Sequence, residues 1–278
     1  MKLLRVLAVN AARWLAVGLS LAGAGVVLLP LAAVVWLSFA PTGTTALGGL
    51  PNISEWSLVQ YRTAWATGQF GLAFWNSALV AIAVTALQIF TSTLAGYALA
   101  RLRFRGRQGI LLGVLATLVI PFQMLVIPIF LVLKWGHLIN TYGALILPTA
   151  ASGFGIFLMR QYFQTLPPEL EEAAMLDGAN RLQVIWYIIV PLGRPAVVTL
   201  FIFTAVGEWN DLFKPLVFTT RPELQTVQLA LASFQEAFTN DWPLLMAAAV
   251  TVTLPVIGLF LIFQRQFVQG IAATGIKR

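Results

Sequence analysis

The chain has 278 residues, of which 59% are hydrophobic and only 10% are charged, and its net charge is +7. A water-soluble chain of this size needs a surface with roughly 25% charged residues or more. The composition therefore excludes an ordinary soluble protein and predicts an integral membrane protein, with residues 1–278 forming a single transmembrane domain. Cysteine is absent, which excludes disulfides and thiolate metal sites.

Six apolar stretches are long enough to cross a bilayer, which takes about 17–25 residues each. The first follows three basic residues, but it is far longer than the roughly 7–15-residue core of a signal peptide, so we interpret it as a retained anchor. The fifth is the least regular, because it contains acidic residues and ends near Pro215. The predicted spans are 14–39, 73–100, 108–133, 142–163, 195–219 and 243–264.

The basic residues predict the orientation, since they stay on the cytoplasmic side of short loops. With six spans, 13 of the 17 lysines and arginines lie on the side of the two termini. Both termini are therefore predicted to be cytoplasmic, with residues 41–72 and 220–242 as external loops. The positive charge is then topological, and we expect no nucleic-acid partner. The arginine-rich stretch 101–107 could also contact anionic membrane lipid, but fixing topology is its simpler role.

An acidic segment connects the fourth and fifth predicted spans. Pro167 and Pro168 open it, and three glutamates follow where the dipole of a helix favours negative charge. Gly178 is typical of a helix stop, and residues 181–189 predict a second helix before Pro191. The pattern indicates a helix–turn–helix exposed to the cytoplasm, which is either an ordinary solvated loop or a docking element.

The same segment resembles the EAA loop of the permease subunits of binding-protein-dependent ABC importers. Val190 stands where that family usually has leucine, but the other fixed positions match: Glu172, Ala173, Ala174, Asp177, Gly178, Ala179, Ile188, Pro191 and Pro195. The resemblance implies a coupling loop over residues 167–191 that seats on an ATPase. Its implied coupling residues are Glu171, Glu172, Ala173, Ala174, Asp177, Gly178, Ala179 and Pro191.

Further positions are similar to the carbohydrate-uptake branch of that family, and within it to the second permease of maltose- and glycerol-3-phosphate-type systems. These are Asn76-Ser77, Glu208-Trp209-Asn210-Asp211 and Phe267–Ile271. The branch usually ends in Gly-Ala-Val-Lys-Gly, whereas this chain ends in Thr274–Arg278. The implied cargo is a sugar or a related polyol or glycoside.

The resemblance implies an all-α integral membrane fold, with six transmembrane helices and cytoplasmic coupling helices, as in type I ABC importers. The implied partners are a second permease in a heterodimer, two cytoplasmic ATPase subunits and an extracytoplasmic solute-binding protein, in a bacterial-type cytoplasmic membrane. ATP and Mg would be bound by the ATPase. This chain contains no G-x-x-x-x-G-K-[ST] phosphate loop, so we expect it to bind no cofactor and not to be an enzyme.

Polar residues inside the predicted spans are the other candidates, because charge inside a membrane is costly and usually functional. Glu208 and Asp211 stand three residues apart on one helical face, beside Trp209 and Asn210. They either contribute to a solute pathway, with Trp209 as a stacking surface for a sugar ring, or they end the helix. In the second interpretation they pair with Lys214 or Arg221 near the external interface.

The third predicted span contains Gln123 between Pro121 and Pro128, which predicts a bent helix. Such a break either frees backbone groups to line a cavity or is an ordinary packing feature.

Two rival classes of protein fit the sequence less well. An intramembrane enzyme built on Ser152 and His137 lacks a partner base on another helix, and a lone histidine without cysteine predicts no metal site. An ion-coupled carrier or channel that works without an ATPase gives the acidic segment no role.

Overall fold

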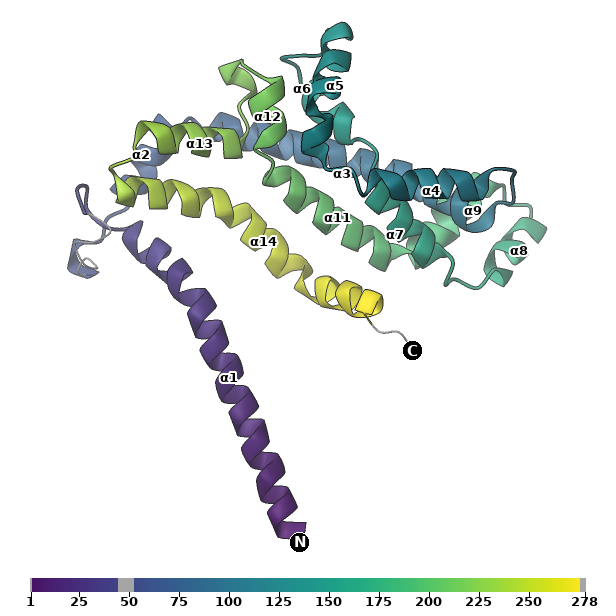
Figure 1. Ribbon diagram of the computed structural model, residues 1–278, viewed down its shortest axis with the longest axis horizontal. Helices are drawn as coiled ribbons and strands as arrows, with labels where there is room; N and C mark the ends of the chain where they lie inside the picture. The colour runs from purple at the N-terminus through teal and green to yellow at the C-terminus, as the bar shows by residue number, and fades with distance from the viewer. Residues whose placement is uncertain (1, 45–52, 276–278) are drawn as a thin grey trace. The chain divides into compact units, whose positions relative to one another are not determined.

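The computed structural model describes residues 2–44 and 53–275, and every regular element in those ranges is a helix (Figure 1). Residues 45–52 of the loop predicted over 41–72 and residues 276–278 of the predicted tail lie outside the described ranges, as do the side chains of the 267–271 motif. The helices are α1 (Lys2–Leu37), η1 (Ile53–Glu55), α2 (Val59–Thr67), α3 (Phe70–Arg101), α4 (Arg107–Thr117), α5 (Phe122–Trp135), α6 (Tyr142–Ile146), η2 (Leu147–Thr149), α7 (Gly153–Phe163), α8 (Glu169–Leu176), α9 (Arg181–Val184), the π-helix η3 (Ile185–Ile189), α10 (Val190–Leu192), α11 (Arg194–Trp209), α12 (Phe213–Phe218), η4 (Pro222–Leu224), α13 (Val227–Ala237) and α14 (Trp242–Gly275).

Three helices in the described ranges are long and apolar enough to cross a membrane unaided, namely Leu15–Leu37 of α1, the whole of α3, and Trp242–Gln264 of α14. Three further segments meet the same criterion only as bent pairs, namely α4 with α5, α6–η2 with α7, and α9–α10 with α11. If each bent pair is one span, the count rises to six. Each of the predicted spans overlaps one of these segments.

The predicted bend of the third span is confirmed. Helices α4 and α5 meet at 103°, and Pro121 is the extended residue that precedes α5. Proline fixes its own backbone and disfavours helix in the residue before it, so a break at this position follows from the sequence.

The fifth predicted span, 195–219, is interrupted in the structure, because α11 ends before α12 begins at Phe213. Helix α11 ends at Trp209, and the apolar helix paired with it precedes it, over Arg181–Leu192, at an angle of 79°. The chain breaks after α11 because the Oδ1 atom of Asp211 accepts hydrogen bonds from the backbone N–H groups of Phe213 and Lys214. A side chain that satisfies its own neighbouring amides competes with helix continuation.

The described chain divides into two compact units, which we treat separately. The first unit comprises Met1–Gly68 and Leu231–Thr253, and the second comprises Gln69–Ala230 and Leu254–Arg278. In the first unit, Trp56 lies between two rings of the α1 end, with ring centroids 4.9 Å from Trp36 and 5.0 Å from Phe39. The candidate sites lie in the second unit.

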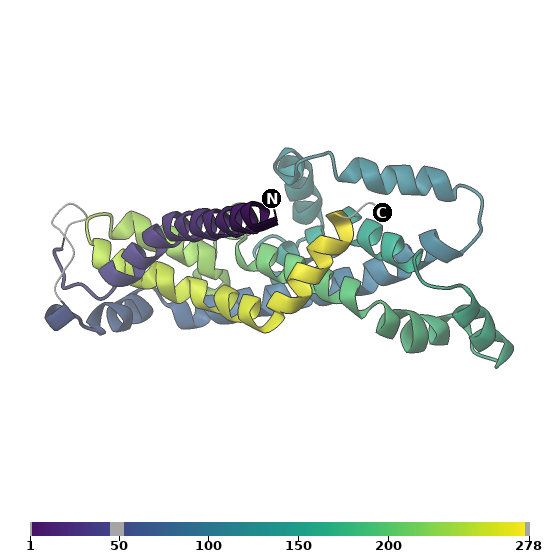
Figure 2. The same ribbon diagram turned by 90° about the horizontal axis from the view of Figure 1, so that it is seen from below.

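In the second unit, α3 packs against both α7 and α11 (Figure 1, Figure 2). Gly96 permits the contact with α7, because a Cβ at this position would lie 2.8 Å from the Cβ of Met159 and 3.0 Å from the backbone nitrogen of Arg160. Small residues that allow close backbone approach are the usual means of joining helices in a membrane.

Candidate functional site

The acidic segment forms the predicted helix–turn–helix. Helix α8 begins after Pro168 and ends in a left-handed residue, Gly178, with φ +90°. The N–H of Gly178 donates to the carbonyl of Met175 at 3.1 Å, and the N–H of Ala179 donates to that of Ala174 at 3.0 Å. This is the Schellman pattern of a glycine-terminated helix, so the predicted stop at Gly178 is confirmed.

The second half of the helix–turn–helix begins with a reciprocal cap. The backbone N–H of Gln183 donates to the side chain of Asn180, and the backbone N–H of Asn180 donates to the side chain of Gln183. Behind this cap, Val184 and Ile189 are buried in the hydrophobic core that also contains Phe163 of α7. The core therefore fixes the second helix, while the first projects from it.

The coupling residues implied by the resemblance differ in exposure. Glu172, Ala173, Asp177, Gly178 and Pro191 are exposed, and Ala174 and Ala179 are half-buried against the core. Leu176, at the end of α8, is 88% exposed. The outer surface of α8 thus combines exposed carboxylates with exposed apolar side chains.

Glu171 is the exception, because it is only 6% exposed. Its Oε1 atom lies 2.6 Å from Nε of Arg101, and its Oε2 atom accepts a hydrogen bond of 2.9 Å from the hydroxyl of Tyr97. Arg101 also donates to the backbone carbonyl of Leu166 at 2.6 Å. The side chain of Glu171 therefore faces the end of α3 rather than the outside of the chain.

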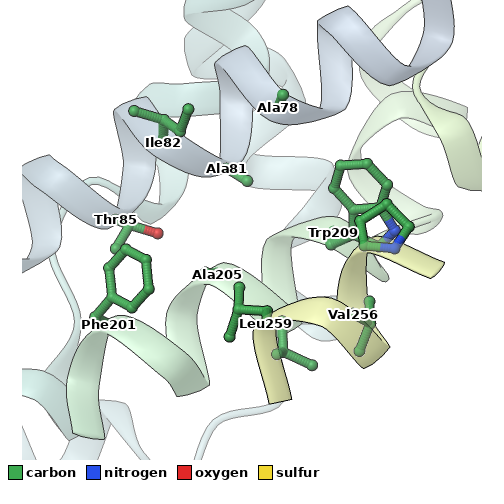
Figure 3. Close-up of a pocket in the computed structure, with 11 residues that line it drawn as sticks. Ala78, Ala81, Ile82, Thr85, Phe201, Ala205, Trp209, Val256 and Leu259 are labelled. Carbon is green, nitrogen blue, oxygen red and sulfur yellow. The ribbon is translucent and has the colours of Figure 1, made fainter. Parts of the chain in front are cut away.

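Trp209 lines an apolar cavity of about 190 Å³ between α3, α11 and α14 (Figure 3). Phe201 and Leu259 lie on its other walls, and Thr85 is one of the few polar side chains that reach it. Trp209 also meets Phe74 edge-on, with ring centroids 5.4 Å apart. Sugar recognition combines a stacking ring with several convergent polar groups, and this cavity supplies the ring without them. The role of Trp209 in solute handling stays a prediction.

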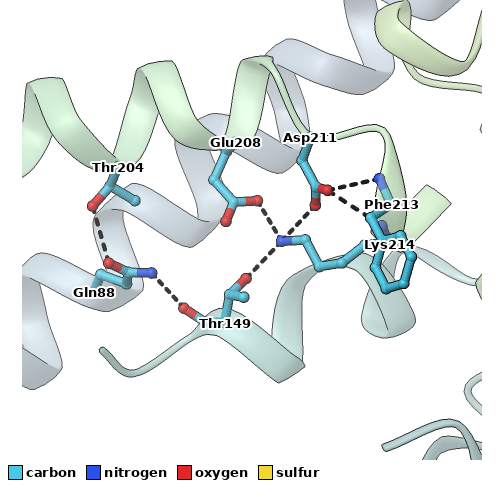
Figure 4. Close-up of polar contacts among 7 residues, drawn as sticks. All are labelled: Gln88, Thr149, Thr204, Glu208, Asp211, Phe213 and Lys214. Carbon is cyan, nitrogen blue, oxygen red and sulfur yellow. Dashed lines mark hydrogen bonds and ion pairs between the residues drawn. The ribbon is translucent and has the colours of Figure 1, made fainter. Parts of the chain in front are cut away.

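Glu208 and Asp211 lie in a buried polar cluster (Figure 4). The Nζ atom of Lys214 lies 2.6 Å from Oε2 of Glu208 and 3.3 Å from Oδ2 of Asp211. Lys214 is 3% exposed. Of the two cations that the sequence offered, Arg221 pairs elsewhere, with Glu223 at 3.5 Å on the surface.

Three residues that the sequence did not single out extend this cluster. Lys214 Nζ donates to the hydroxyl of Thr149 at 2.8 Å, and the carbonyl of Thr149 accepts from the amide of Gln88 at 2.7 Å. Gln88 in turn accepts from the hydroxyl of Thr204 at 2.9 Å. Figure 4 shows the chain of contacts running from α11 through α3 and η2 to α12. Single polar residues in apolar helices were the only available sequence signal.

The polar cluster encloses very little space. The cavity bordered by Glu208, Asp211 and Lys214 measures about 10 Å³, which is the size of one water molecule. A sugar ring cannot enter the cluster in this conformation. The contacts therefore describe a structural junction, in line with the interpretation of a helix end that pairs with Lys214.

The other predicted pathway residues do not join this cluster. Asn210 accepts a hydrogen bond from the side chain of Gln228 at 3.2 Å, and Gln123 is exposed in the first turn of α5. Ser152, considered above as a nucleophile, caps α7 by accepting from the N–H of Gly155 at 3.3 Å, and His137 lies in a turn with φ 54°.

Asn76 and Ser77 anchor the segment between α12 and α13. The amide of Asn76 donates to the carbonyls of Glu223 and Gln225, both at 2.9 Å. Its oxygen accepts from the hydroxyl of Tyr142 at 2.7 Å, and Ser77 accepts from the N–H of Val227 at 2.8 Å. The start of α3 therefore holds a loop that is distant in sequence.

The described residues are helical, with long apolar helices, bent helix pairs and an exposed helix–turn–helix between two of them, which is the pattern of a multi-span membrane protein. The model of the family described as binding-protein-dependent transport system inner membrane component matches residues 92–273, and the chain belongs to this family. The predicted resemblance is thereby confirmed. The family consists of transport components and not of enzymes.

Curated relatives include carbohydrate permeases. The lactose transport system permease protein of Rhizobium radiobacter is 32% identical over 242 residues, which cover 86% of this chain and 89% of that protein. The arabinooligosaccharides permease of Halalkalibacterium halodurans is 34% identical, covering 76% and 75%. The sn-glycerol-3-phosphate permease of Yersinia enterocolitica is 33% identical, covering 73% of each.

Solved structures support the fold. A chain of a bacterial ABC transporter involved in the import of the acidic polysaccharide alginate superposes with a TM-score of 0.77 at 26% identity, covering 90% of this chain and 95% of that one. A second chain, from the alginate transporter in complex with its pentasaccharide-bound periplasmic protein, superposes with a TM-score of 0.53 at 16% identity. The fold is therefore that of an ABC importer permease.

Proposed function

We propose that this chain forms half of the translocation pathway of an ATP-driven carbohydrate importer, and that residues 167–191 couple it to a separate ATPase. The exposed surface of α8 is the observation that carries the proposal. This helix has eight residues, projects from the core and lies between two apolar segments. We propose that a soluble partner binds this helix.

The chemistry of this surface favours a protein partner over lipid. Leu170, Met175 and Leu176 are 43%, 39% and 88% exposed, while Glu172 and Asp177 are exposed on the same short helix. Carboxylates are repelled by the anionic surface of a cytoplasmic leaflet. An apolar patch bordered by carboxylates instead fits a cleft with an apolar floor and a cationic rim, and burial of apolar side chains at such a site supplies most of the binding energy.

The proposed cargo is a sugar, glycoside or related polyol. The support comes from relatives of similar length that are named for lactose, arabinooligosaccharides and glycerol-3-phosphate. The other subunits of the importer are proposed on the same basis. We propose a second permease subunit, an extracytoplasmic binding protein that delivers solute, and two ATPase subunits that hold ATP and Mg. We propose that both termini of this chain lie on the ATPase side, which the distribution of its basic residues favours.

A charge reversal on α8 tests the coupling assignment. We expect Glu172→Lys to accumulate in the membrane but to lose co-purification of the cognate ATPase, because the cationic rim of the cleft would then face a cation. Glu236→Lys is the matched control, since Glu236 is exposed and lies on the predicted opposite side of the membrane. Undiminished ATPase binding and ATP-dependent uptake by Glu172→Lys would contradict the proposal.

A further inference from the structure

Two neighbouring glutamates of α8 have opposite environments. Glu172 is exposed, whereas Glu171 is 6% exposed, with its Oε1 atom 2.6 Å from Nε of Arg101 and its Oε2 atom accepting from the hydroxyl of Tyr97. The 6% exposure of Glu171 leaves little carboxylate surface for a cationic residue of an ATPase. Glu171 and Glu172 therefore have different roles.

The partners of Glu171 belong to one face of a single span. Tyr97 and Arg101 are four residues apart at the C-terminal end of α3, so their side chains leave the same side of the helix. Tyr97 is 2% exposed and is part of the core that includes Met159 and Phe163. The carboxylate of α8 is thus joined to the C-terminal end of α3, a helix of 32 residues.

Arg101 contacts both Glu171 and the connection that leads into α8. One nitrogen of its guanidinium meets Glu171 and another donates to the carbonyl of Leu166, which lies in the connection leading into α8. Buried ion pairs add little net stability and are best known for fixing register.

From this geometry we infer that Glu171, Arg101 and Tyr97 form a link that carries the displacement of α8 to α3, with Glu171 as a positioning residue and not as an ATPase contact. The inference rests on the proposed coupling function of α8. When an ATPase moves the outer surface of α8, the buried carboxylate on its inner surface moves the end of α3 with it. Loss of the link would leave α8 docked while α3 no longer follows.

The test separates docking from transmission in the reconstituted complete importer, with the cognate ATPase, second permease and binding protein. We expect Glu171→Gln to retain co-purification of the ATPase, while the amount of solute imported per ATP hydrolysed falls about tenfold. Exchange of the two charges, Glu171→Arg with Arg101→Glu, is expected to recover most of that loss. The exposed Glu236→Gln is the control, because Glu236 lies outside both the buried link and the proposed coupling loop.

Two results of this test would overturn the inference. Wild-type import per ATP in Glu171→Gln would overturn the inference, as would loss of ATPase binding that the charge exchange does not recover. Neither result would affect the proposed function, which Glu172→Lys tests separately. If Glu171→Gln does not accumulate in the membrane, Tyr97→Phe is the variant that tests the link. It keeps the aromatic ring in the core and removes the hydroxyl donor to Glu171. It is expected to lower import per ATP, and unchanged coupling would overturn the inference.

Discussion

The ammonium of Lys214 lies 2.6 Å from the carboxylate of Glu208, and side-chain exposures of 4% and 9% place both out of contact with solvent. Lys214 belongs to α12 and Glu208 to the last turn of α11, so the pair closes the break that interrupts the chain after Trp209. An isolated charge in an apolar surrounding is too costly to persist, and the pair exists because each member neutralises the other.

Removal of the cation should therefore destabilise the chain. We expect Lys214→Met to lower the free energy of unfolding by on the order of 3 kcal/mol, because Glu208 and Asp211 are left buried without a counter-charge. The midpoint of thermal unfolding of the purified protein in detergent measures the effect. Lys134→Met, at an exposed lysine, is the control. Equal midpoints for the two variants would show that the cluster adds nothing.

A double variant distinguishes charge from packing at the same cluster. Lys214→Met combined with Glu208→Gln removes one cation and one anion together, so it should recover a large part of the stability lost in Lys214→Met. If the double variant is less stable than the single one by the full cost of a second substitution, the two side chains are not coupled.

Close packing of α3 and α7 predicts intolerance at Gly96. A methyl group there overlaps the side chain of Met159, so Gly96→Ala should cost about 1–3 kcal/mol of stability despite the better helix propensity of alanine. Gly109→Ala is the control, because the space around Gly109 is open and the gain in propensity should appear there. Thermal unfolding of both variants checks this, and a stabilised Gly96→Ala protein would contradict the packing described.

The hydrogen bonds of Asn76 should protect a loop that is distant in sequence from local opening. Asn76→Ala removes two hydrogen bonds to the carbonyls of Glu223 and Gln225, each worth about 1 kcal/mol. Local opening should increase, so cleavage after Glu223 by a glutamate-specific protease is expected to accelerate about tenfold or more. Glu236 provides an internal reference in the same digest. An unchanged rate at Glu223 would mean that the loop is held by other contacts.

The backbone geometry of Gly178, in the turn after α8, predicts which substitutions this position tolerates. At φ +90° a β-branched residue is strained, so Gly178→Val should displace the end of α8 and reduce ATP-dependent uptake strongly, without loss of membrane insertion. Gly178→Asn should retain much of the uptake, because asparagine tolerates the left-handed region better. Similar uptake by the two variants would indicate that the turn geometry is unimportant.

Local signals explain how much the sequence could predict. Prolines at 121 and 168 and the glycine at 178 determine breaks and ends through their own backbone preferences, and the structure has a break or a helix end at each of them. The helix–turn–helix and the bend of the third span were predictable for that reason. Family membership followed from the spacing within the same segment.

Long-range contacts explain what the sequence could not predict. The burial of Glu171 beside exposed Glu172 depends on which side of α8 packs on α3, and nothing within the segment indicates that side. The contacts from Gln88 to Thr149 and from Lys214 to Thr149 join residues 61 and 65 positions apart. The interruption of the fifth predicted span was not predicted, because the side chain of Asp211 ends the helix and hydropathy does not register that contact.

The dependence of transport on an ATPase tests the central claim most directly. The chain and its second permease are reconstituted into vesicles with the cognate binding protein and a labelled sugar, with and without the ATPase subunits. We predict ATP-dependent uptake only when the ATPase is present, and loss of that uptake in Glu172→Lys. Uptake at a comparable rate without the ATPase would show a self-sufficient carrier or channel and would contradict the account.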